Sequence, residues 1–464
     1  MPSAKPGISR RKLFERAAGA AALGSMFRFA EQPAGAQPPA ARPVNRNSAP
    51  SQLRITDMRA IRIASNYDYP IIRVDTNQGV YGLGEARDAG NEGMALILKP
   101  HVVGKNPLNI AQILDSVRNF ANQRRMGGGY SALDIALHDI SGKVYGVPAY
   151  RLLGSKYRDS VRIYCDTTET ADPKLFAERL VLRKKNGFTF FKMDLGTDLV
   201  ARQPGAVNTR GVATEKGLKL LCEYIATVRD GIGYDVPLAA DHFGPLNVND
   251  AIRYARAFEP YDLAWMEDPL QVGTLSTGDA PKNWRFYKEI KEATTTVINT
   301  GESLFGLEEG FRPLIENLAV DMIHPDPLTA GALIETKRIA DFASTYGIPT
   351  AVHFAGSPVG CMAAVHMVAT IKDFVAMENH AVDIPWWGDL VTGVPKPIIQ
   401  NGYIRVPETP GLGVELDEEA CRQHLRIPGW FEPTPQFDKP IVDEYRLGGP
   451  YPHLDDNGKP VVSR

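Results

Sequence analysis

Residues 161–378 contain eight short apolar segments, and a polar residue stands at or near the end of each. A stretch long enough for a helix follows every segment. From Lys192 onward the polar ends are 49, 26, 35, 24, 27 and 25 residues apart. Parallel strands need helical crossovers of this length, so the repeat predicts an α/β fold with a (β/α) barrel. The segments are residues 161–166, 189–194, 237–241, 263–267, 297–302, 322–326, 350–353 and 374–378.

The one long interval, after Lys192, predicts an inserted loop at residues 197–213. A loop that follows a barrel strand lies over the active-site face, which predicts a lid carrying Arg202 and Arg210. A solvated surface loop is an equal alternative. A doubly wound open sheet is disfavoured, because it needs a glycine-rich phosphate loop after its first strand, and residues 166–169 read Asp-Thr-Thr-Glu.

The chain before the barrel has a different texture. Residues 54–64 and 70–75 alternate between apolar and polar side chains and predict two strands, with a third at 80–85. Helical periodicity follows at residues 109–122 and 130–140. Strands followed by helices are typical of an α+β domain.

The N-terminus has the composition of an export signal. Residues 1–36 carry six cations and two acids, with Arg10 and Arg11 paired before a short apolar stretch and the sequence Ala-Gly-Ala at 34–36. This pattern predicts a twin-arginine signal peptide, a linker at 37–50 and a periplasmic protein, with no membrane contact after cleavage. The apolar stretch is shorter than the roughly 20 residues that span a bilayer. A basic amphipathic tail is the alternative.

Charge and cysteine content exclude other classes. The 464 residues include 52 Lys+Arg and 54 Asp+Glu, a formal charge of −2, and removal of residues 1–36 leaves 46 cations and 52 acids, near −6. No long basic run indicates a nucleic-acid partner. The four cysteines are far apart, so neither a zinc site nor a disulfide framework is indicated.

Three acidic residues end successive predicted strands: Asp241, Glu267 and Glu302. The ends of adjacent barrel strands converge, so these carboxylates should lie together. Hard carboxylate oxygens suit Mg²⁺, whereas zinc prefers cysteine and histidine. A buried charge is unfavourable unless it is paired or ligates a metal, which favours a Mg²⁺ site over three separate caps or salt bridges.

Four further strand-end residues predict acid–base chemistry. Asp326 and His353 end neighbouring strands, and a carboxylate beside an imidazole fixes its tautomer and raises its basicity. Lys192 could bind a substrate carboxylate or act as a base. Glu378, as a neutral acid, could donate a hydrogen bond to a developing enolate. A satisfied core histidine and structural ion pairs are the alternatives for these residues.

Short motifs follow one another in a fixed order through both halves of the chain. They are residues 82–86 (GLGEA), 131–136 (SALDIA), 152–154 (LLG), 267–269 (EDP), 301–302 (GE), 325–326 (PD) and 407–413 (PETPGLG). Over about residues 51–430 the chain thereby resembles the enolase superfamily, in particular its mandelate racemase/muconate lactonizing enzyme-like subgroup and the acid-sugar dehydratases within it.

The resemblance implies an α+β capping domain at 51–160, a modified TIM-type barrel at 161–395 and a C-terminal segment at 396–464 that returns to the cap and ends in a tail. It implies one Mg²⁺ on the three carboxylates and proton abstraction next to a substrate carboxylate by His353, oriented by Asp326. The metal and Glu378 would stabilise the enediolate, and the family often forms homo-oligomers.

The chain departs from the family at two positions. Where the second strand often ends Lys-x-Lys, it reads Lys192-Met193-Asp194, so Asp194 replaces a second base and a two-base racemase loses support. Some dehydratases of the family carry a histidine acid two residues after the first metal ligand. Here His242 follows Asp241 directly, and strand alternation would direct it elsewhere.

The substrate should be selected by the loop at 66–69, which in the family closes over the site. We therefore expect Asn66 and Tyr67 to contact substrate. We expect the same of Asp194 and His242, at the ends of barrel strands. The sequence as a whole predicts a periplasmic Mg²⁺-dependent dehydratase of a hydroxy or sugar carboxylic acid. The alternatives are a racemase, epimerase or cycloisomerase using the same enediolate, and an exported sugar-acid-binding protein without activity.

Overall fold

A computed structural model describes residues 50–88, 90–121, 127–270 and 279–439. The predicted signal peptide and nearly all of the predicted linker lie outside the described residues, as does the end of the C-terminal tail. Within the described ranges, no helix combines the length and the apolar character that crossing a membrane requires.

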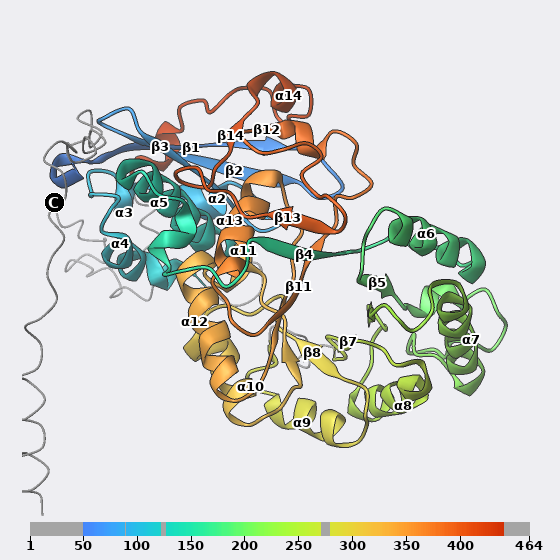
Figure 1. Ribbon diagram of the computed structural model, residues 1–464. Helices are drawn as coiled ribbons and strands as arrows, with labels where there is room; N and C mark the ends of the chain where they lie inside the picture. Colours follow the sequence, from blue (N-terminus) through green and yellow to red (C-terminus); the bar gives the residue numbers. More distant parts are fainter. Residues whose placement is uncertain (1–49, 89, 122–126, 271–278, 440–464) are drawn as a thin grey trace, which may run out of the picture. The chain divides into compact units, whose positions relative to one another are not determined.

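Eight parallel strands, β4 to β11, form a closed barrel, which confirms the predicted fold class (Figure 1). Pairing of β11 with β4, with Met377 opposite Ile163, closes the ring. An added strand, β13 (Tyr403–Arg405), pairs antiparallel with β4. The barrel strands are β4 (Ser160–Cys165), β5 (Phe191–Asp194), β6 (Leu238–Asp241), β7 (Met266–Glu267), β8 (Ile298–Thr300), β9 (Met322–Ile323), β10 (Thr350–Val352) and β11 (Phe374–Asn379).

Helices follow the strands, and several begin at a side chain that caps them. Asp172, Thr214, Asn247 and Ser357 each accept a hydrogen bond from a backbone N–H in the first turn. The larger barrel helices are α6 (Pro173–Lys185), α7 (Glu215–Ile232), α8 (Val248–Phe258), α9 (Trp284–Glu292), α10 (Arg312–Glu316), α12 (Ala332–Thr345) and α13 (Pro358–Ala369).

A buried apolar layer inside the barrel supports the polar strand ends. Successive side chains of a strand alternate between faces, so residues two apart point the same way. Five members of one buried cluster each stand two positions before a predicted site residue. They are Phe190 before Lys192, Ala239 before Asp241, Trp265 before Glu267, Ala351 before His353 and Ala376 before Glu378. The site residues therefore form the next inward-facing layer.

The predicted α+β domain is an antiparallel sheet of β1 (Ile55–Ile63), β2 (Tyr69–Thr76) and β3 (Tyr81–Glu85), packed on α5 (Gly128–Tyr145). The glycines of the GLGEA motif allow this packing. A Cβ on Gly84 would lie 1.9 Å from the carbonyl oxygen of Ala132 in α5. The motif therefore encodes a close approach between strand and helix. Shorter helices of this domain are α2 (Gly93–Leu96), α3 (Lys99–Val102) and α4 (Ile110–Val117).

The chain returns to this domain after the barrel. The Gly411 carbonyl accepts a hydrogen bond from Ala149 N at 2.8 Å, and Leu412 N donates to Asp139 of α5 at 2.9 Å. Farther on, Asp438 lies 2.7 Å from Lys99 Nζ. The remaining elements of this segment are β12 (Val391–Thr392), β14 (Glu415–Leu416) and α14 (Glu418–Arg422).

The inserted loop at 197–213 packs against neighbouring barrel helices. Ala206 and Val212 are buried, and Ala213 N donates to the hydroxyl of Tyr254 in α8 at 2.8 Å. Arg210 lies 3.1 Å from Asp250, also in α8, while Arg202 is exposed. Arg210 therefore forms a structural ion pair with Asp250.

Candidate active site

The predicted site residues come together at the carboxyl ends of the barrel strands. Asp241 and Glu267 are the last residues of β6 and β7, and Glu378 lies near the end of β11. His353 directly follows β10. In (β/α) barrels this end of the strands is where active sites form.

Lys192 is the central cation of this layer. Its Nζ lies 2.6 Å from Glu378 Oε1 and 3.4 Å from both Asp241 Oδ2 and Glu267 Oε1. Burial lowers the pKa of Lys192, but the three carboxylates together raise it well above its usual value. Lys192 is therefore a charged ammonium here, which opposes a role as a base and fits electrostatic binding of a carboxylate.

His353 and Asp326 form the predicted pair. His353 Nδ1 lies 2.6 Å from Asp326 Oδ2, and both side chains are buried. Asp326 is itself fixed, because its Oδ1 accepts a hydrogen bond from Leu328 N and its Oδ2 lies 3.4 Å from Arg87 Nη1. The pairing leaves His353 Nε2 to act on a substrate, which is the arrangement that a general base requires.

The predicted metal ligands fit a divalent cation by their donor atoms and charge. Burial and the neighbouring charge of Glu267 raise the pKa of Asp241 well above its usual value, a sign of unneutralised negative charge. Glu302 extends toward His353, with Oε2 3.0 Å from its Nε2. Among the described residues, no candidate group with ligand atoms within 4.8 Å combines all three carboxylates, although Asp241 and Glu267 each belong to one. Carboxylates of this kind would hold Mg²⁺ rather than zinc.

Glu378 corrects one expectation. Glu378 is predicted from the sequence to be a neutral acid, but its side chain lies among cations. Burial raises its pKa, yet Lys192, His380 and His353 outweigh this effect and hold the pKa well below the usual range. Glu378 is therefore a carboxylate in this structure and accepts, rather than donates, hydrogen bonds.

Three buried residues that the sequence analysis missed orient the carboxylates. Trp265 Nε1 donates to Glu267 Oε2 at 2.7 Å, and His324 Nδ1 lies 3.1 Å from Glu267 Oε1. The Tyr164 hydroxyl lies 2.6 Å from His324 Nε2 and donates a hydrogen bond to Glu378 Oε2 at 3.0 Å. Trp265 and Tyr164 belong to inward-facing strand positions, and that alternation is the signal that could have identified them.

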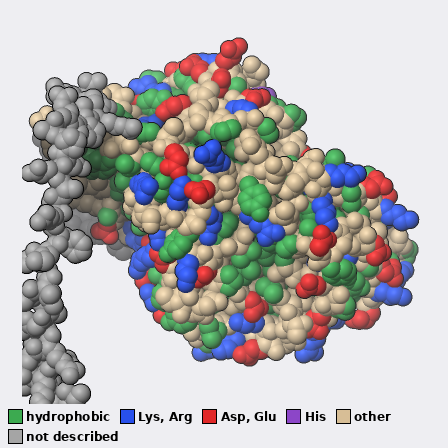
Figure 2. Space-filling view, in the orientation of Figure 1, with side chains coloured by type: hydrophobic (Ala, Val, Ile, Leu, Met, Phe, Trp, Pro, Cys, Tyr) green, Lys and Arg blue, Asp and Glu red, His purple; other side chains and the backbone are tan. Residues whose placement is uncertain are grey.

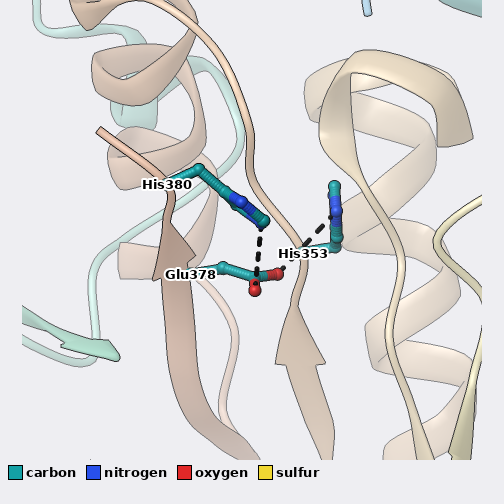
Figure 3. A group of neighbouring side chains, drawn as sticks. All are labelled: His353, Glu378 and His380. Carbon is teal, nitrogen blue, oxygen red and sulfur yellow. Dashed lines mark ion pairs between the residues drawn. The ribbon is translucent and has the colours of Figure 1, made fainter. Parts of the chain in front are cut away.

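His380 is a fourth residue that was not predicted from the sequence, and it faces His353 across Glu378 (Figure 3). Its Nε2 lies 3.1 Å from Glu378 Oε1, and its Nδ1 lies 3.1 Å from Asp166 Oδ2. Burial lowers the pKa of His380, but Glu378 and Asp166 raise it well above its usual value. The imidazole is therefore protonated.

The cap reaches the barrel mouth at His380. Asn66 Nδ2 donates to the His380 carbonyl at 3.0 Å, and the Tyr67 ring meets the imidazole edge-on at 5.7 Å. Arg87, which follows β3, donates from Nη1 to the Glu302 carbonyl at 2.6 Å. Asn66 and Tyr67 thus lie beside the site, as expected for the loop at 66–69. Their contact with substrate stays a prediction.

Asp194 and His242 also lie together. His242 has a left-handed backbone, with φ of 57°, which turns it out of the strand alternation. Its Nδ1 lies 3.0 Å from Asp194 Oδ1 and 3.4 Å from Asp241 Oδ2. These two carboxylates raise the pKa of His242 to about 10, with Asp241 the larger cause. The prediction that strand alternation directs His242 elsewhere is therefore wrong, because its side chain lies at the mouth of the barrel beside Asp194 and Asp241.

Family comparisons agree with this geometry over both halves of the chain. Residues 41–154 match the family "Mandelate racemase / muconate lactonizing enzyme, N-terminal domain", and residues 176–420 match "Enolase C-terminal domain-like". The chain belongs to the mandelate racemase-like subgroup of the enolase superfamily. This subgroup membership makes it an enzyme, and the resemblance stated from the motifs is confirmed.

Relatives and solved structures extend the comparison. A D-xylonate dehydratase from Haloferax volcanii is 36% identical over 381 residues, which cover 80% of this chain and 89% of that protein. A mandelate racemase/muconate lactonizing enzyme-like protein from Rubrobacter xylanophilus is 30% identical with a TM-score of 0.73, covering 82% and 99%. The 3,6-anhydro-D-galactonate cycloisomerase from Zobellia galactanivorans is 27% identical with a TM-score of 0.68, covering 81% and 100%.

Proposed function

We propose that this protein is a Mg²⁺-dependent dehydratase of a sugar acid. The observation that carries the proposal is the buried His353–Asp326 pair, with 2.6 Å between Nδ1 and Oδ2, beside the carboxylates at the barrel mouth. The D-xylonate dehydratase among its relatives supports an aldonic acid as the substrate.

The chain's own residues would carry out the proton transfer. His353 Nε2 takes the proton from the carbon next to the substrate carboxylate, and Asp326 holds the imidazole in the required tautomer. Lys192 places a positive charge near the substrate carboxylate. A Mg²⁺ on Asp241, Glu267 and Glu302 would supply Lewis-acid stabilisation of the charge that develops there. The β-hydroxyl then leaves as water.

A panel of five- and six-carbon aldonates, assayed for 2-oxo acid formation with and without Mg²⁺, tests the proposal. We expect turnover of at least one acid only with Mg²⁺, and His353→Asn should lower it by about 10²–10⁴-fold. If His353→Asn turned over every acid at the wild-type rate, the catalytic assignment would be wrong and a binding role would gain support.

A cycloisomerase or epimerase is the second candidate, because a cycloisomerase of sugar-acid type shares the fold along the whole of its own chain. Both reactions begin with the same proton abstraction. Incubation in D₂O separates them. Deuterium incorporation or isomer formation without loss of water would favour the second candidate, whereas loss of water supports the dehydratase.

A further inference from the structure

The site contains two imidazole–carboxylate pairs built in the same way, and the proposed reaction so far uses one. His353 follows β10, and its Nδ1 pairs with Asp326 at 2.6 Å. His380 follows β11, and its Nδ1 pairs with Asp166 at 3.1 Å. Each carboxylate comes from the strand next to that of its histidine. Asp166 directly follows β4, which β11 meets where the barrel closes.

The second ring nitrogen of each pair lies near Glu378, although that of His353 is closer to Glu302, at 3.0 Å. His353 Nε2 lies 3.8 Å from Glu378 Oε2, and His380 Nε2 lies 3.1 Å from Glu378 Oε1 (Figure 3). The ring centroids are 5.6 Å apart, and the three side chains bring one ligand-type atom each within 4.8 Å of the others. Two imidazoles at this separation can reach groups on adjacent carbons of a single substrate.

The proton on His380 Nε2 is available for transfer. This buried nitrogen makes an ion pair with Glu378 Oε1 at 3.1 Å and meets the geometry of a hydrogen bond with no described residue. The carboxylates on either side of the ring, Glu378 and Asp166, keep the imidazole protonated. A protonated imidazole that faces the site is what an acid catalyst needs before its substrate binds.

We propose that His380 is the general acid that protonates the departing β-hydroxyl, while His353 is the base; this inference rests on the proposed function. The α C–H bond breaks, its proton goes to His353 Nε2, and its electron pair forms the enediolate. That pair then expels the β-oxygen, which takes the Nε2 proton of His380 and leaves as water. The enol that remains tautomerises to the 2-oxo acid.

Two alternatives to this assignment have less support. His242 is also charged, but its side chain is 58% exposed, and it follows β6, which lies across the barrel from β10. A transition metal on His353, Glu378 and His380 would sit against the Lys192 ammonium, which is 2.6 Å from Glu378 Oε1. His380 and His353 follow the adjacent strands β11 and β10. His380, and not His242, therefore lies on the same side of the barrel as the base.

A leaving group that needs no proton separates acid catalysis from a structural role. The substrate found with the aldonate panel would be compared with its analogue carrying fluorine in place of the β-hydroxyl. We expect His380→Asn to lower turnover of the hydroxy acid by about a hundredfold or more, with fluoride release close to wild type. Exchange of the α-proton with D₂O should persist, which also shows that the variant is folded.

Matched variants complete the test. His101→Asn, on the cap surface beside Phe120, should leave all three measurements unchanged, and His353→Asn should abolish all three. Unimpaired elimination of the hydroxy acid by His380→Asn would overturn the assignment. Equal losses of turnover by His380→Asn on the hydroxy and fluoro acids would also overturn it. The same would follow if His242→Asn, and not His380→Asn, lost turnover of the hydroxy acid alone. Wild-type enzyme that eliminates water from no acid would instead refute the proposed function.

Discussion

At the scale of single residues, Trp265 would tune the proposed metal site without touching a metal. Its indole N–H fixes Glu267 Oε2 at 2.7 Å, and Glu267 is fully buried. Partners that orient metal ligands typically change metal affinity 10–100-fold when removed. We expect Trp265→Phe to weaken Mg²⁺ binding about 10-fold or more, as measured by calorimetric titration of the protein alone.

The control for this prediction is Trp284→Phe, because Trp284 lies in α9 and its ring contacts Arg285 rather than a site residue. Equal Mg²⁺ affinity in Trp265→Phe and wild type would show that the indole does not orient Glu267, or that Glu267 is not a ligand. An accompanying loss of near-ultraviolet signal in both variants is expected from the missing indole alone.

Residue identity explains which parts of the site were predictable. Asp241, Glu267 and His353 end apolar strands, so their charge stands out against the segment before them. His380 does not, because it comes two residues after Glu378, with which the apolar segment 374–378 ends. Its partner Asp166 is more than two hundred residues earlier, and only closure of the barrel brings the two together. Pairings made by closure leave no local signal in a sequence.

At the scale of elements, β3 is joined to α13 through one buried carboxylate. Glu85, the last residue of β3, accepts hydrogen bonds from Ser357 N at 2.8 Å and Gly360 N at 2.9 Å. Burial raises its pKa from 4.5 to about 7, even though these hydrogen bonds lower it. The loop held in this way directly follows His353, so the contact couples the cap to the strand that precedes His353.

The raised pKa of Glu85 predicts a pH-dependent stability. The folded state binds this proton more tightly than the unfolded chain, so the contribution is complete below pH 4.5 and is lost as pH rises through about 7. Relative to Glu85→Gln, the wild type should lose about 3 kcal/mol of unfolding free energy between pH 4.5 and 8. Denaturant unfolding of both proteins across this range measures the difference; parallel pH profiles would contradict the prediction.

The β3–α5 contact makes a second prediction at this scale. Gly84→Ala would drive a Cβ against the Ala132 carbonyl, and backbone atoms on both sides cannot rotate away. We expect a loss of about 1–3 kcal/mol in unfolding free energy, measured by urea denaturation. Gly388→Ala is the matched control, because its nearest atoms would lie at 3.9 Å. Similar losses in the two variants would mean that close packing is not the reason for this glycine.

At the scale of the whole molecule, the sequence predicts the architecture better than the joints between its parts. The strand–helix repeat indicates a parallel α/β fold, and the absence of a glycine-rich loop after the first strand favours a barrel over an open sheet. Contacts such as Arg87 with Glu302, 3.6 Å apart at their charged atoms, join cap to barrel across a long sequence separation. They depend on how two surfaces meet, and hydrophobic periodicity does not describe that.

The same long-range construction bears on the predicted twin-arginine export. Asp241 and Glu267 end β6 and β7, and Glu302 follows β8, so a metal site on these three carboxylates would exist only after the barrel has closed. Export through the twin-arginine route would deliver the protein already folded, with its metal bound. We therefore expect replacement of Arg10 and Arg11 by lysines to leave most of the protein in the cytoplasm as a folded, protease-resistant precursor, while Lys12→Gln is exported normally. Fractionation of cells that express the full chain measures this, and periplasmic accumulation of the double variant at the wild-type level would refute the predicted route.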